Sequence, residues 1–175
     1  MIKKILAAYD GSDNAQRALD LAVELCAKCD ASLVVVHVLM HGRPAAELVR
    51  MAHAEHMVQE AHKAISPGVT FASGRAYDLF SASADAAGTL RVISSVGDQL
   101  VAHAKNHAEE LGLEAVQTVV RSGDYADEIL AVANDQMVDM IVMGSRGLGL
   151  VRGAVVGSVS QKVMHHAEQA VLAVK

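Results

Sequence analysis

Short apolar runs alternate along this chain with segments in which apolar residues recur every three or four positions. In the N-terminal part, apolar runs at 2–9 and 31–39 flank a helix-like pattern at 15–28. The turn Asp10-Gly11-Ser12-Asp13 separates the first run from the helix and contains residue types that commonly start one. Two buried strands joined by an amphipathic helix predict a βαβ unit with parallel strands and a right-handed crossover.

The C-terminal part repeats this alternation. One helix-like pattern leads to Gly112, and glycine commonly stops a helix by adopting a left-handed conformation. The predicted elements are a helix at 92–111, a strand at 113–121, a helix at 124–135, a strand at 138–143, a helix from Gly157-Ser158 to about 166, and a strand at 170–174. This order predicts an α/β fold, a doubly wound parallel five-stranded sheet with helices on both faces.

The composition favours a single domain over 1–175, long enough to bury its own core. Hydrophobic residues make up 52% and aromatic residues only 3%, so aliphatic side chains must build an interior suited to strands buried on both faces.

The region 40–92 is predicted to be a helical insertion after the second strand, with a helix at 45–65 that Ser66-Pro67-Gly68 ends. We expect it to flank the mouth of a site or to extend a subunit contact.

Charge and special residues exclude several classes of function. A net charge of −5 argues against binding to nucleic acid or to an anionic membrane, and no apolar run reaches ~18 residues. The start shows no signal-peptide pattern, which predicts a cytoplasmic location. Cys26 and Cys29 lie within a helix pattern and are expected to be structural, while His103 and His107 lack a third ligand, so no metal site is predicted.

A glycine-punctuated loop carries the candidate chemistry. It follows the apolar strand at 140–143 with Gly144, then Gly147 after two residues, then Gly157-Ser158 after nine more at the start of a helix. A strand, a glycine loop and a helix start together bring backbone N–H groups against phosphate, because glycine lets the backbone approach closely. The spacing fits neither the P-loop nor the dinucleotide fingerprint.

The loop resembles the nucleotide-binding signature of the ATP-binding branch of the universal stress protein family. The resemblance extends to Ile5-Leu-Ala-Ala-Tyr-Asp-Gly-Ser, to Val35-Val36-His37-Val38, and to the segment from Arg121 to Ile129, whereas 40–92 departs from the family. It implies the sheet order 3-2-1-4-5, with a switch point between strands one and four. Ligands of open α/β sheets bind outside the carboxyl ends of the strands at such a point, where Asp10 and Gly144 end their strands.

The same resemblance assigns roles to individual residues. It implies that five residues contact adenosine and ribose: Tyr9, Asp10, Val38, Met143 and Gly144. It implies that four others hold the phosphates: Gly147, Gly157, Ser158 and Val159. Four further residues are phosphate candidates: Ser145, Arg146, Arg152 and Ser160. Simpler roles remain open, because Asp10 and Ser158 can cap helices and the two arginines can merely be solvated.

These features predict a regulatory stress-response protein that binds ATP, or ADP or AMP, with Mg²⁺ as an optional companion. The alternative is a slow ATP hydrolase or an adenylate-forming enzyme at the same site. The glycine loop has no lysine and no obvious base, so little catalysis is expected and no catalytic residue is assigned.

An apolar C-terminal edge strand predicts a homodimer through Val171, Leu172 and Val174, which is how the family dimerises. The family usually has a proline before this strand, and Glu168-Gln169-Ala170 stands in its place.

Overall fold

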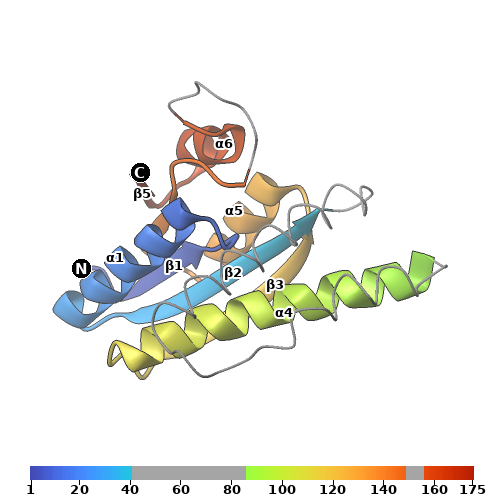
Figure 1. The fold of residues 1–175 in the computed structure, drawn as a ribbon. Coiled ribbons are helices and arrows are strands. Elements are labelled where there is room, and N and C mark those ends of the chain that lie inside the picture. Colours follow the sequence, from blue (N-terminus) through green and yellow to red (C-terminus); the bar gives the residue numbers. More distant parts are fainter. Residues whose placement is uncertain (41–85, 149–155) are drawn as a thin grey trace.

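A computed structural model describes residues 1–40, 86–148 and 156–175 of the chain (Figure 1). The predicted helix at 45–65 lies outside these residues. The elements in chain order are β1 (Lys4–Ala8), α1 (Asp13–Cys29), β2 (Ser32–Met40), α4 (Ala86–Glu110), β3 (Val116–Gly123), α5 (Tyr125–Asp135), β4 (Met140–Gly144), α6 (Ser158–His166) and β5 (Ala170–Val174). No helix in the described part is long and apolar enough to cross a membrane.

The five strands form one parallel sheet in the order β3-β2-β1-β4-β5. This confirms the predicted fold class and strand order. In the register of the sheet, Ala8 at the end of β1 lies between Val36 of β2 and Met143 of β4. The chain therefore reverses its winding between β1 and β4, where the carboxyl ends of both strands meet.

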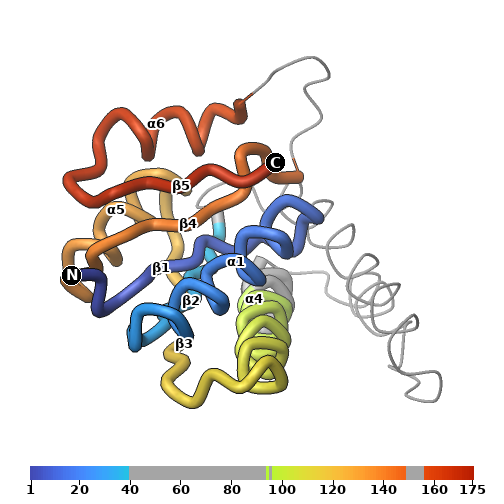
Figure 2. The backbone as a smooth tube through the Cα atoms, turned by 90° about the vertical axis from the view of Figure 1, so that its left-hand side faces the viewer, coloured from blue at the N-terminus to red at the C-terminus, as the bar shows by residue number. Residues whose placement is uncertain are grey.

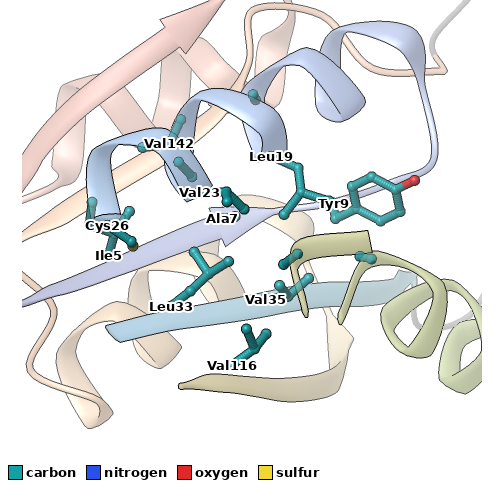
Figure 3. Close-up of a cluster of buried hydrophobic side chains, with 14 of the residues drawn as sticks. Ile5, Ala7, Tyr9, Leu19, Val23, Cys26, Leu33, Val35, Val116 and Val142 are labelled. Atoms are coloured by element: carbon teal, nitrogen blue, oxygen red, sulfur yellow. The ribbon is translucent and has the colours of Figure 1, made fainter. Parts of the chain in front are cut away.

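The sheet is buried on both faces because successive side chains of each strand point to opposite sides. One face packs against α1 and α4 and includes Ile5, Ala7, Leu33 and Val35 (Figure 3). The other face packs Leu6 and its neighbours against α5 and α6. Figure 2 shows the resulting layers, with α1 and α4 together on one side of the sheet. This arrangement explains why Val and Ala dominate the interior of a chain with few aromatic residues.

Several element boundaries differ from the predictions, and three of them concern α1, β3 and α4. Helix α1 begins at Asp13 rather than 15, because Ser12 caps it and the Ser12 Oγ accepts a hydrogen bond from Ala15 N at 3.2 Å. Strand β3 begins at Val116 rather than 113, since Leu113 N still bonds to Ala108 O of α4. Helix α4 spans Ala86–Glu110, so 86–92, which the sequence placed in the insertion, belong to this helix.

The end of α5 offers a test of backbone strain. Met137 has a φ of 50° and an 82% exposed side chain, while Val138 N closes the turn on Ala133 O at 3.0 Å. Because a non-glycine residue is strained in the left-handed region, Met137→Gly should raise the free energy of unfolding by about 0.5–1 kcal/mol. Urea denaturation measures it. In the control Met164→Gly, an exposed position inside α6, the sign should reverse.

Candidate functional site

The carboxyl ends of β1 and β4 lead into two loops that touch each other. The first loop turns at Gly11, whose φ of 78° requires glycine, before Ser12 starts α1. Asp10 joins the two loops: its Oδ1 accepts from Ser12 N and its Oδ2 from Leu148 N, both at 3.1 Å. Asn14 adds a second link by donating from Nδ2 to the carbonyl oxygen of Arg146 at 3.3 Å.

Two glycines of this region are required by close packing, not by unusual φ angles. A Cβ on Gly144 would lie 2.9–3.0 Å from backbone atoms of Arg146, Ala15 and Asn14, so this glycine lets the start of α1 rest on the end of β4. A Cβ on Gly147 would lie 2.2 Å from the Asp10 Oδ2. Each glycine thus marks a contact between the two loops.

Gly157 differs from both, because the described residues around it leave room for a side chain. It is the N-cap of α6 with φ −74° and ψ 156°, and a Cβ would meet its nearest described atoms at 3.5–3.8 Å, an ordinary contact. No side chain caps this helix within the described part of the chain. Ser158 is exposed, and Gly157 N is anchored on Ser145 O at 2.7 Å. The start of α6 therefore presents backbone N–H groups that no side chain of the described residues caps.

The four further phosphate candidates fall into different environments. The Ser160 Oγ donates to the carbonyl oxygens of Gly144 and Ser145 at 2.9 and 3.1 Å and is buried, so this hydroxyl holds α6 on the end of β4. The Ser145 side chain is also buried, and its Oγ has no partner among the described residues. Arg146 is exposed, and Arg152 lies outside the described residues.

The residues expected to meet adenosine lie on two faces of the sheet. Val38 and Met143 pack on the face covered by α5 and α6, and Val159, which was expected at the phosphates, packs against the same cluster. The Tyr9 side chain is buried on the opposite face among the side chains of α1 (Figure 3). Its hydroxyl donates to Gln16 Oε1 at 2.9 Å, and burial raises the pKa of this phenol, with smaller contributions from Asp10 and Asp20.

The backbone of Tyr9 is also engaged. Its N–H donates to Val36 O at 2.9 Å, and its carbonyl oxygen lies 2.8 Å from His37 Nδ1. Tyr9 therefore acts as a support that fixes where Asp10 leaves the sheet. The sequence pattern did not show this role, because the facing of a residue just beyond a strand depends on where the strand ends.

Sequence reasoning missed Lys162, which fixes α6 to α5. The Lys162 Nζ lies 3.1 Å from Asp124 Oδ1 and 2.7 Å from Asp127 Oδ1, and Asp124 also caps α5. The pKa of Asp124 is lowered mainly by the hydrogen bond that Lys162 donates to it. The pKa of Lys162 is raised mainly by the hydrogen bond between Lys162 and Asp127. The local sequence does not predict the contact between Lys162 and Asp124, because these residues are 38 positions apart.

His107 and Cys26 have structural roles. The His107 Nε2 lies 2.7 Å from Asp20 Oδ1 and joins α4 to α1. Cys26 is buried and its pKa is raised to about 11, chiefly by burial, which leaves an unreactive thiol. A search of the described residues finds no group of three or more His, Cys, Asp or Glu residues able to hold a metal ion.

Comparisons with known proteins agree on one family. A model of the universal stress protein family matches residues 1–175. Universal stress protein YxiE of Bacillus subtilis is 31% identical over 168 residues, covering 93% of this chain and 92% of the relative. A universal stress protein solved in complex with cAMP has a TM-score of 0.61 at 18% identity, covering 99% of this chain and 97% of its own. An Arabidopsis thaliana family protein with AMP bound has a TM-score of 0.60 at 19% identity, with coverage of 99% and 91%. At these identities the two structures show the shared fold.

Proposed function

The chain belongs to the universal stress protein family, and from this premise we propose that it is a stress-response protein regulated by a bound adenine nucleotide. The nucleotide would lie outside the carboxyl ends of β1 and β4, with ATP as the first candidate and ADP or AMP as alternatives. The two fold relatives solved with cAMP and AMP support this ligand class. The geometry where β1 and β4 end supports a site at this position.

The observation that carries the proposal is the start of α6. A helix start without a side-chain cap concentrates unsatisfied N–H groups and the positive end of the helix dipole. Gly157 needs no special φ, and the described residues around it leave room for a Cβ, so none of them requires a glycine there. A phosphate that approaches the backbone of Gly157, Ser158 and Val159 explains the missing side chain.

The β2 backbone supports an adenine site beside this phosphate site. The carbonyl of Val36 faces β1, since it accepts from Tyr9 N. In a parallel sheet, the N–H and C=O of one residue point to the same neighbouring strand, and every second residue points to that strand. Val38 lies two residues after Val36, which pairs with Ala8 of β1, so the N–H and C=O of Val38 also face the β1 side. A donor beside an acceptor matches the edge of adenine that offers N1 and the 6-amino group. Met143 would add apolar contact.

We propose binding with little or no catalysis. Phosphoryl transfer requires cations and a positioned base around the phosphates. Both oxygens of Asp10 accept backbone N–H groups, and Lys162 is held by Asp124 and Asp127. These engaged groups favour a binding protein over a hydrolase or an adenylate-forming enzyme, and any Mg²⁺ would arrive with the nucleotide.

The nucleotide class is tested on the protein as purified from cells. Heating the protein and analysing the released small molecules by mass spectrometry should yield an adenine nucleotide in a stoichiometric amount. Release of another class of nucleotide would replace the proposed ligand. If no nucleotide is released, titration of the protein with added nucleotide tests whether it binds this class of ligand.

We also propose a homodimer through β5. This strand lies at the edge of the sheet, and its side chains at Val171, Leu172 and Val174 pack on the protein's own core. A partner would therefore pair mainly with its backbone. Ala170 N bonds to Asp139 O and Val174 O accepts from Ser145 N, so even positions face β4 and the N–H groups of Val171 and Ala173 face outward. Such an edge pairs readily with a second copy.

Ala173→Pro tests this route, because proline removes an outward donor and leaves the ladder to β4 intact. We expect the dimer dissociation constant to rise at least about tenfold, the effect of losing two symmetry-related hydrogen bonds. Light scattering over a concentration series measures it. Ala173→Val, which keeps the N–H, is the matched control and should remain dimeric. A parent protein that is monomeric, or a proline variant that dimerises as the parent does, would contradict the proposed interface.

A further inference from the structure

Asp10 holds the glycine loop from a position 138 residues away in the chain. Its carboxylate is half-buried and uses one oxygen in each loop, Oδ1 for Ser12 N and Oδ2 for Leu148 N. Hydrogen bonds from N–H groups to a charged carboxylate are stronger than those between neutral groups. The carboxylate therefore connects the start of α1 to the chain that leaves β4.

The glycine at 147 is explained by this carboxylate. Gly147 is exposed, and its φ is not among the left-handed values of the described residues. The three described atoms nearest to a Cβ at this position all belong to the Asp10 carboxyl group, at 2.2, 3.3 and 3.9 Å. An alanine would thus displace the carboxylate and break its bond to Leu148 N.

We propose that Asp10 is a positioning residue whose carboxylate latches the loop after β4, and that Gly147 is a glycine because this latch occupies the space of its side chain. The inference rests on the proposed function, since the latched loop leads from Gly144 toward the phosphate-binding start of α6. It assigns Asp10 a role in the ligand-free protein, distinct from a direct contact with nucleotide or Mg²⁺.

The latch makes the two residues energetically coupled. In the parent protein, Gly147→Ala should displace the carboxylate and so reproduce the effect of Asp10→Ala. Once Asp10 is alanine, the same change at 147 should have little further effect. Two independent sites would instead give additive effects.

Amide hydrogen exchange of Leu148, followed by NMR in the ligand-free protein, tests the latch directly. We expect Asp10→Ala, Gly147→Ala and the double variant to accelerate exchange to the same extent, about tenfold to a hundredfold, as loss of one hydrogen bond to a charged acceptor implies. The amides of Ile141 and Val142 in the buried β4 strand serve as an internal reference for an intact fold. Asp13→Ala, which removes the same charge from an exposed position, should leave Leu148 unchanged.

The parent, Asp10→Ala, Gly147→Ala and the double variant are then titrated with ATP. Each single variant should bind about tenfold more weakly than the parent, and the double variant should be no weaker than either single one. Unchanged Leu148 exchange in Asp10→Ala would overturn the latch and leave Asp10 as a ligand contact. Additive effects of the two substitutions would overturn the coupling. A parent protein that binds neither ATP nor AMP would instead reject the proposed function, while the exchange rates would still decide whether the latch exists.

Discussion

Gly157→Val is expected to abolish nucleotide binding while the fold stays intact. The backbone angles at Gly157 lie in the β region, which valine favours, and a Cβ there meets its nearest described atoms at 3.5 Å or more. The two methyl groups would fill the space in front of the helix N–H groups. Loss of two hydrogen bonds to a charged phosphate removes about 3–6 kcal/mol, so affinity should fall at least about a hundredfold.

The comparison requires affinity and stability measured on the same protein. Calorimetry with ATP gives the first, and urea denaturation should show a loss of only about 1 kcal/mol, because valine is a poorer N-cap than glycine. Gly157→Ala, with one methyl group, should weaken binding by a smaller factor. If the valine variant binds ATP as tightly as the parent, the phosphates do not lie at the start of α6.

Gly144→Ala is expected to destabilise the protein strongly. Its Cβ would lie 2.9–3.0 Å from a carbonyl oxygen, an amide nitrogen and a carbonyl carbon of the backbone, none of which can rotate away. The start of α1 would have to move off the end of β4. The free energy of unfolding should fall by about 3 kcal/mol, the upper range for overpacking a close contact.

Gly123→Ala is the matched control for this prediction. Its Cβ would come closer to a neighbour, 2.6 Å from Glu128 Oε1, but this atom is the far end of a flexible side chain. We expect the control to lose less than about 1 kcal/mol, within the range of most single substitutions. Equal losses in the two variants would show that rigid contact between α1 and β4 does not explain Gly144.

Much of the fold followed from the pattern of apolar residues, because buried parallel strands are short continuous runs and their helices are amphipathic. The strand at 170–174 and the helix that starts at Gly157-Ser158 lie where the sequence predicts them. Boundaries were less accurate where a long-range contact decides them. Strand β3 continues to Gly123, two residues past the prediction, because Met40 of β2 pairs with it.

The candidate site could be predicted in its backbone but not in its side-chain contacts. Glycine spacing indicated where N–H groups would face a phosphate, and strand order indicated which loops would meet. The link from Asp10 to Leu148 and the role of Tyr9 as a support depend on how distant segments pack. The same packing distinguishes the three loop glycines: close contacts within the protein require Gly144 and Gly147, while the described residues leave room for a side chain at Gly157.

The central claim is tested most directly by calorimetric titration of the parent protein with ATP, with AMP and GTP titrated in parallel. We predict saturable binding of ATP or AMP with one site per chain and a dissociation constant between about 1 μM and 1 mM, the range of cellular ligand levels. GTP should bind at least about tenfold more weakly, because its 6-oxo group cannot donate to the Val38 carbonyl. No heat and no thermal stabilisation with any of the three at millimolar concentration would contradict the account.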